Sequence, residues 1–137
     1  MYDADCGVCR WSLAKVLAWD RRRVLRPVAL QDPEAARLLA GMGEDERMAS
    51  WHLVAPDGRV SSGGAAFAPL GRLLPGGRRL AALAARFPRA AEGAYRLVAD
   101  HRTGLGRLVT RSAAARARRR IEARSASLRF VPARRPY

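Results

Sequence analysis

The sequence predicts an α/β domain that continues into further helices. Three observations support this class. Segments of strand and helix composition alternate in the first half of the chain, Gly and Pro residues separate them, and the excess of positive charge falls mainly near the C-terminus. The 137 residues, 49% of them apolar, suffice for one domain that buries its own core.

The chain begins with a short strand, a helix and a second strand. Residues 1–3 have the composition of a strand end, and residues 9–23 place apolar side chains on one helical face. Residues 24–30 again have strand composition. Pro27 cannot donate to a ladder, so it places this strand at a sheet edge or a bulge.

A second helix and a hairpin follow in the middle of the chain. Asp32 can cap the helix, Pro33 suits its first position, and Gly41 can end it. Residues 51–55 and 59–61 then predict two strands that pair around a Pro-Asp-Gly turn.

Helices account for most of the second half, over residues 65–74, 80–87 and 90–102. The resulting order, β-α-β-α-β-β-α, is that of a thioredoxin-like fold with a small mixed sheet, to which the later helices are additions. We divide the chain into a thioredoxin-like domain over residues 1–106 and an Arg-rich tail over residues 107–137, which is partly helical or disordered.

The formal net charge of +14 is concentrated in this tail. Residues 107–137 contain ten arginines and one acidic residue, which gives +9, whereas the rest of the chain carries +5. A solvated basic tail explains this distribution, so we expect nucleic acid not to be a partner. The start of the chain lacks the basic and apolar runs of a signal peptide, and no segment has the length of a membrane span. We therefore expect a cytoplasmic protein.

The only two cysteines, Cys6 and Cys9, lie at the start of the first predicted helix. A disulfide across so short a loop would add little stability, so redox chemistry explains the spacing better. Free backbone N–H groups and the positive end of the helix dipole favour a thiolate at Cys6, which is the predicted nucleophile. Cys9, one turn later and more buried, is the predicted resolving thiol with the higher pKa.

Two carboxylates and two histidines complete the candidate site residues. Asp3 can accept a proton from Cys9, although a negative neighbour also opposes thiolate formation; alternatively, Asp3 only ends the strand and Asp5 caps the helix. A zinc site needs four ligands, and His52 and His101 supply no second closely spaced pair. We therefore predict catalytic roles for Asp3 and the two cysteines, with no metal and no cofactor. Two buried and inert thiols are the alternative.

The segment Tyr2–Cys9 resembles the opening of the DCC family of thiol–disulfide oxidoreductases, whose Asp-x-x-Cys-x-x-Cys pattern falls on Asp3, Cys6 and Cys9. Looser matches follow in the same order at residues 29–31, 57–58, 62–66 and 95–102. The resemblance spans residues 1 to about 106. It implies a thioredoxin-like fold and disulfide exchange through the dithiol.

These observations predict a thiol–disulfide oxidoreductase of the protein-disulfide reductase type. Its partners would be a disulfide- or thiol-containing protein or small molecule and a cellular thiol reductant. Two other classes stay open: a redox-regulated or catalytically silent thioredoxin-like binding module, and a nucleic-acid-binding protein that uses the basic tail.

Overall fold

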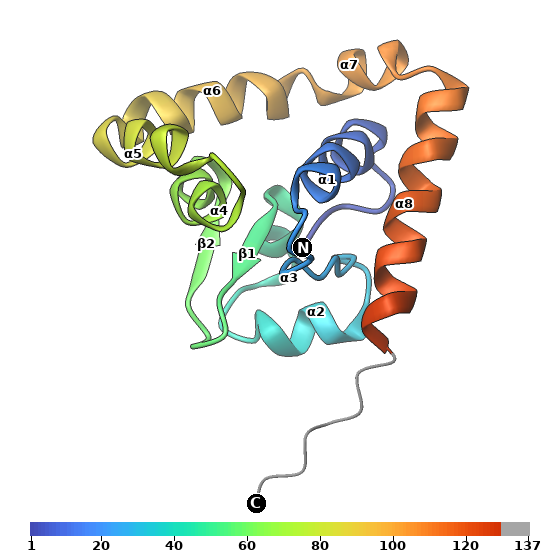
Figure 1. Cartoon of the computed structure of the whole chain (residues 1–137), viewed down its shortest axis with the longest axis horizontal. Coiled ribbons are helices and arrows are strands. Elements are labelled where there is room, and N and C mark those ends of the chain that lie inside the picture. The colour runs from blue at the N-terminus through green and yellow to red at the C-terminus, as the bar shows by residue number, and fades with distance from the viewer. Residues whose placement is uncertain (130–137) are drawn as a thin grey trace, which may run out of the picture.

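The computed structural model describes residues 1–129 and shows a mixed α/β protein that is mostly helical (Figure 1). In chain order the elements are α1 (Gly7–Trp19), α2 (Pro33–Leu38), α3 (Glu44–Ala49), β1 (His52–Val54), β2 (Val60–Ser62), the 3-10 helix η1 (Gly63–Ala66), α4 (Phe67–Leu73), α5 (Arg78–Arg86), α6 (Pro88–Asp100), α7 (Arg102–Leu108) and α8 (Arg111–Arg129). The predicted α/β class is confirmed. Residues 130–137 of the predicted tail lie outside the described residues.

A small antiparallel sheet consists of β1 and β2, with His52 opposite Ser62. The first residues of the chain lie beside β1, because backbone hydrogen bonds run between Met1 and His52 in both directions, at 2.6 and 3.4 Å. On the other side, Tyr2 forms a parallel bridge with Ala29. The lateral order is therefore the segment around Ala29, the first two residues, β1 and β2.

The predicted strands over residues 1–3 and 24–30 are reduced to this single bridge. Tyr2 exchanges two backbone hydrogen bonds, of 3.1 and 2.9 Å, with the second segment. The ladder does not continue toward the start of that segment, where Pro27 offers no N–H group. The prediction of a strand over residues 24–30 is thus wrong, and the short element predicted at residues 1–3 is a single bridge residue. The predicted adjacency of the two segments holds.

Helix α1 starts and ends earlier than the predicted range of residues 9–23. Asp20 follows the helix, and its carboxylate accepts hydrogen bonds from the backbone N–H groups of Val24 at 3.2 Å and Leu25 at 2.9 Å. Arg23 adopts a left-handed backbone conformation with φ of 55°. Together these features turn the chain away from the helix axis.

Helix α8 runs along α1 and supplies part of the core (Figure 1). Ala117 and Ile121 are buried on its inner face, and its arginines lie mostly on the outer face. The predicted tail is therefore, up to residue 129, a helix packed on the domain. Alanine covers little apolar area, so the sequence alone showed only a weak apolar face here.

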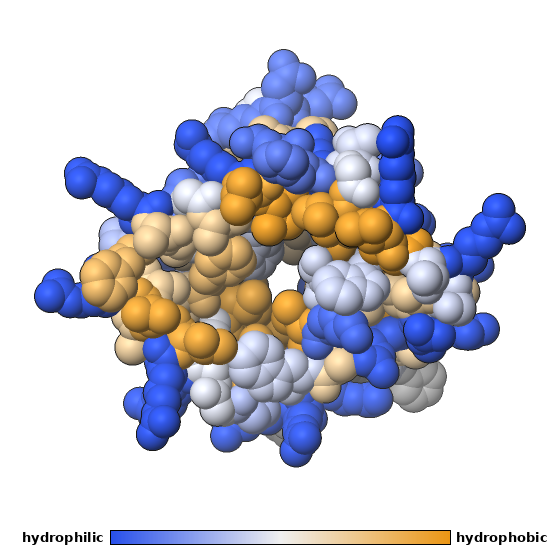
Figure 2. All heavy atoms as spheres, turned by 90° about the horizontal axis from the view of Figure 1, so that it is seen from above, coloured by the Kyte–Doolittle hydropathy of each residue, from blue (hydrophilic) through white to orange (hydrophobic). Residues whose placement is uncertain are grey.

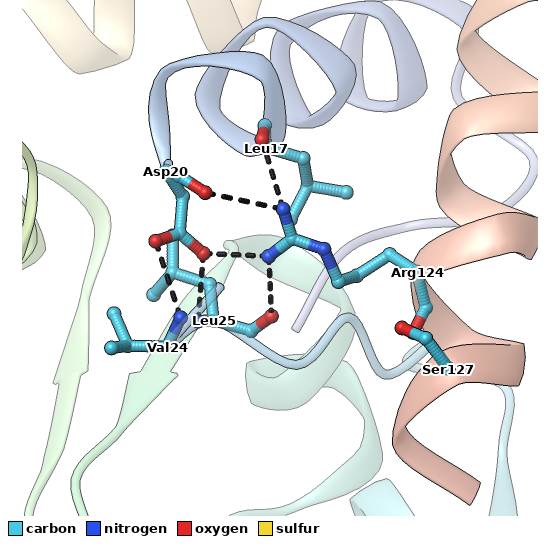
Figure 3. Close-up of polar contacts among 6 residues, drawn as sticks. All are labelled: Leu17, Asp20, Val24, Leu25, Arg124 and Ser127. Atoms are coloured by element: carbon cyan, nitrogen blue, oxygen red, sulfur yellow. Dashed lines mark hydrogen bonds and ion pairs between the residues drawn. The ribbon is translucent and has the colours of Figure 1, made fainter. Parts of the chain in front are cut away.

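A buried ion pair joins α8 to the end of α1 (Figure 3). Arg124 donates to the Asp20 carboxylate at 2.6 Å and to the backbone carbonyls of Leu17, Asp20 and Leu25 at 3.1 to 3.3 Å. Burial alone would raise the pKa of Asp20. The N–H groups of Leu25 and Val24 and the guanidinium outweigh that effect and hold this pKa below its ordinary value.

Helices α4, α5 and α6 form the other side of the molecule, and two glycines let them approach η1. Gly64 donates its N–H to the Glu92 carboxylate at 2.9 Å. A Cβ on Gly64 would lie 2.4 Å from the Cα of Glu92, so only glycine fits. Gly63, with φ of 55°, starts the turn. None of the helices within residues 1–129 has the length and hydropathy to cross a lipid bilayer.

Candidate redox site

The dithiol lies at the N-terminus of α1, as predicted. Cys6 is the N-cap residue, in extended conformation, and its Sγ accepts a hydrogen bond from the backbone N–H of Cys9 at 3.3 Å. The alternative in which Asp5 caps the helix is wrong, because a cysteine occupies the cap position. Both thiols are free and partly exposed. An N–H group directed at the Cys6 sulfur stabilises negative charge on it.

Cys9 lies one turn further along and is chemically different from Cys6. Burial raises the pKa of the Cys9 thiol from 9.0 to about 12, and the neighbouring Cys6 and the Asp3 charge add to this effect. Arg102, at the start of α7, opposes it. Cys9 is therefore a protonated thiol at neutral pH. Such a group can act as the second thiol of an exchange reaction once a base removes its proton.

Asp3 ends the central extended segment and lies beside the cavity that Cys9 also lines. Its Oδ1 accepts hydrogen bonds from the backbone N–H of Asp5 at 3.0 Å and from the side-chain amide of Gln31 at 2.7 Å. No hydrogen bond joins the Asp3 carboxylate to Cys9 within residues 1–129. Asp3 thus acts on Cys9 through its charge, and a proton would pass between them only after a small approach or through water.

The side chain of Gln31 holds the loop that precedes Cys6. Its Nε2 donates to the carboxylates of Asp3, at 2.7 Å, and Asp5, at 3.2 Å, while its Oε1 accepts the backbone N–H of Ala4 at 3.1 Å. The reversed amide would set its oxygen against two carboxylates and its NH₂ against an N–H donor, so the bonding pattern fixes the orientation. One neutral amide therefore bridges two negative groups.

Gln31 is not among the site residues that the sequence predicts. Its position in the sequence could have indicated a role in the site. Gln31 follows the second extended segment, just as the Asp3 loop follows the first. The ends of adjacent parallel segments meet at one edge, where side chains from both can converge. Only the pairing of Tyr2 with Ala29 makes that register visible.

Within residues 1–129 neither histidine forms a hydrogen bond with the dithiol loop, although His52 lines the cavity beside it. His52 is buried, with Nδ1 at 2.7 Å from Ser62 Oγ and Nε2 at 2.9 Å from the carbonyl of Arg47, and burial lowers its pKa. His101 contacts the Leu97 carbonyl at 2.8 Å on the exposed side of α6. Within residues 1–129, no group of three or more His, Cys, Asp or Glu side chains is placed to hold a metal ion.

A cavity of about 460 Å³ adjoins the dithiol, with Cys9 and Asp3 in its wall. Most of the rest of the wall is apolar, with contributions from Leu13, Val16, Trp51, Phe67, Leu70 and Val98. The face of the molecule that carries α6 and α7 is hollowed near its centre, and hydrophobic side chains lie along the upper and left sides of the hollow (Figure 2). The redox loop and an apolar cavity therefore share one region of the surface.

Two thiols one helical turn apart, one bonded to a backbone N–H and one kept protonated by burial, define a class of site suited to thiol–disulfide chemistry. Comparison with known families agrees. The model of the DCC1-like thiol-disulfide oxidoreductase family matches residues 1–108, and the chain belongs to this family. The resemblance stated from the sequence is thereby confirmed. Searches of curated proteins and of solved structures found no match.

Proposed function

We propose that this protein is a thiol–disulfide oxidoreductase of the protein-disulfide reductase type that acts through Cys6 and Cys9. The observation that carries the proposal is the hydrogen bond from the Cys9 backbone N–H to the Cys6 sulfur at the N-terminus of α1. It favours negative charge on Cys6, whereas burial keeps Cys9 protonated. This difference supports a nucleophilic role for Cys6 and a resolving role for Cys9.

The reaction proceeds in two exchange steps. The Cys6 thiolate attacks one sulfur of the substrate disulfide, the S–S bond breaks, and the departing thiolate takes up a proton. Cys9 then loses its proton and attacks the Cys6 sulfur, which releases the second substrate thiol. The substrate gains two electrons and two protons, and the protein is left with a Cys6–Cys9 disulfide. A cellular thiol reductant, in the cytoplasm, restores the dithiol.

Asp3 is the proposed proton acceptor for Cys9 in the second step. It lies beside the same cavity, and its charge raises the Cys9 pKa, which indicates that the two groups are close. When the mixed disulfide has formed, Cys6 no longer carries charge, and the Cys9 proton is then easier to remove. The carboxylate can receive that proton and pass it to solvent.

We also propose that the fold is thioredoxin-like. The support is the lateral order of extended segments, in which the first residues lie between the segment around Ala29 and β1. The pairing is parallel on one side and antiparallel on the other, and the first helix starts directly after the central segment. This is the arrangement that the predicted element order requires.

Reduction of insulin by dithiothreitol, followed by turbidity, tests the activity. Cys6→Ser is expected to abolish the catalysed rate, and Cys9→Ser to retain the first step but accumulate a mixed disulfide that mass spectrometry detects. The two serine variants are matched controls for each other. If the variant with both cysteines replaced were as active as the wild type, the proposal would be wrong, and the binding-module alternative would gain support.

A further inference from the structure

The apolar cavity beside Cys9 is too large to be an ordinary packing defect. An engineered cavity of about 150 Å³ is enough to bind benzene, and this one measures about 460 Å³. A sealed void of that size would cost free energy comparable with the whole stability of a domain. Its volume is instead that of small-molecule sites, which span roughly 300 to 1,000 Å³. It is therefore better explained as a site that a ligand fills.

The wall of the cavity is built from elements that meet around the redox loop. Leu13 and Val16 come from α1, Phe67 from α4, Val98 from α6, and Trp51 from the residue before β1. Helices α1 and α6 contribute opposite parts of the wall, and they are not among the helix pairs with substantial mutual contact. The space between them is thus left open to the surface, as the hollow in Figure 2 shows.

The cavity reaches the dithiol at Cys9, whereas Cys6 lies outside its wall. Cys9 and Asp3 are part of its wall, and Arg102, which lies close enough to lower the Cys9 pKa, is part of the wall as well. The wall also includes the polar residues Ser12, Arg26, Ser50 and His52, but most of its lining is apolar. A molecule that reacts with the dithiol would have its sulfur at the part of the wall that contains Cys9 and its apolar part among the leucine, valine and aromatic side chains.

We propose that this cavity binds the apolar group of small-molecule disulfides, which form a further substrate class of the protein besides protein disulfides. The assignment rests on the proposed function of the dithiol. In the first step Cys6 attacks the disulfide R–S–S–R, which forms the mixed disulfide Cys6–S–R and releases one thiol. The remaining R group occupies the cavity. Cys9 then attacks the Cys6 sulfur, the second thiol leaves, and the cavity empties.

Three substrates test the assignment: dibenzyl disulfide, bis(2-hydroxyethyl) disulfide and insulin. Both small disulfides release alkyl thiols, so they differ chiefly in the apolar group. We expect kcat/KM for dibenzyl disulfide to exceed that for the hydroxyethyl compound at least tenfold. Ala94→Phe, at an exposed position of the cavity wall on α6, should reduce that ratio at least tenfold. Ala90→Phe is the matched control, because Ala90 is exposed on the same helix outside the wall.

A direct binding measurement separates the cavity from the chemistry. Fluorescence titration with 8-anilino-1-naphthalenesulfonate should give at least tenfold weaker binding for Ala94→Phe than for wild type and Ala90→Phe, and Val98→Phe should repeat the effect. Equal binding by all four proteins would overturn the assignment, as would equal kcat/KM for the two small disulfides. An equal loss of insulin reduction in Ala94→Phe would also overturn it. Inactivity of the wild type toward all three substrates would instead overturn the proposed function itself.

Discussion

The two ends of α1 each carry an aspartate, but the surroundings of these residues are opposite in kind. Asp20, after the C-terminal end, is buried and paired with the guanidinium of Arg124 from a distant part of the chain. Asp3, before the N-terminal end, is only partly buried and bonded to the neutral amide of Gln31. The Asp20 carboxylate is thus paired with a cation, whereas within residues 1–129 the Asp3 carboxylate, near the Cys9 thiol, has no ion-pair partner.

The two aspartates therefore differ in what they do: Asp20 anchors the C-terminal end of α1, and Asp3 belongs to the candidate redox site. The guanidinium of Arg124 bonds to a carboxylate and to three backbone carbonyls at once, so it fixes the end of α1 against α8. The amide of Gln31 sets the shape of the redox loop but adds no positive charge beside the Asp3 carboxylate. The Asp3 charge is one of the causes that raise the Cys9 pKa.

The largest expected effect concerns the anchored end. Arg124→Met should lower the free energy of unfolding by about 3 to 5 kcal/mol, because it leaves the Asp20 carboxylate buried without a partner. Urea denaturation measures the change. Arg118→Met is the matched control on the same helix: its guanidinium is exposed and 3.9 Å from Glu122, and loss of such a pair costs at most about 1 kcal/mol. Equal losses in the two variants would contradict the anchoring role.

The next effect concerns the start of the helix. Gln31→Glu places a third carboxylate against Asp3 and Asp5, and should lower kcat/KM for insulin reduction about tenfold or more, since a hydrogen bond to a charged group contributes about 1.5 to 3 kcal/mol. Replacement of Asp5 by Asn in the same protein should restore part of the rate, because it removes one of the repelling charges. If Gln31→Glu remained fully active, the amide would have no positioning role.

The stability contributions of Cys9 and Asp20, near the two ends of α1, should be lost at opposite extremes of pH. The pKa of Cys9 is raised in the folded protein, so its contribution to stability is complete below about pH 9 and is lost as the pH rises toward 12. The pKa of Asp20 is lowered, so its contribution is present above the ordinary aspartate value and is lost as the pH falls through the folded-state pKa. Urea denaturation at pH 8 and pH 10 should show a smaller alkaline loss for Cys9→Ala than for wild type. A loss of the same size in both proteins would remove Cys9 as its source.

The smallest effect separates the two ways in which Asp3 can act on Cys9. Asp3→Asn removes a charge that raises the Cys9 pKa, and this pKa should fall modestly because burial is the larger cause. The pH dependence of Cys9 alkylation in a Cys6→Ser background measures the fall. If Asp3 also accepts the proton, release of a preformed mixed disulfide should become slower in Asp3→Asn despite the lower pKa. Faster release would leave Asp3 with a purely electrostatic role.

The sequence was sufficient to predict the position of the dithiol at the start of α1 and the order of most elements. The Cys-x-x-Cys spacing and the capping residues around Asp32 and Pro33 act over a few positions, and α2 starts where they indicated. The hairpin of β1 and β2 also formed around the predicted turn. Capping and turn residues act on neighbouring positions of the chain, so their effect can be predicted without knowledge of distant contacts.

Features that depend on distant contacts were missed. The role of Gln31 depends on the register between two extended segments, and the packing of α8 depends on a carboxylate more than a hundred residues away. The sequence predicts a solvated tail, partly helical or disordered, because the segment is basic and its apolar face contains little besides alanine. Burial of a charged side chain becomes predictable only when its partner is known.

The position of α8 has a consequence for where this protein can be cut. The family match stops at residue 108, and a fragment designed to that limit would contain both cysteines, Asp3 and Gln31. It would nevertheless expose the apolar flank of α1 and leave the buried Asp20 carboxylate with no cation. The folding unit is therefore longer than residues 1–108, which the family model matches. Fragments made for structural or biochemical work should extend at least to residue 129.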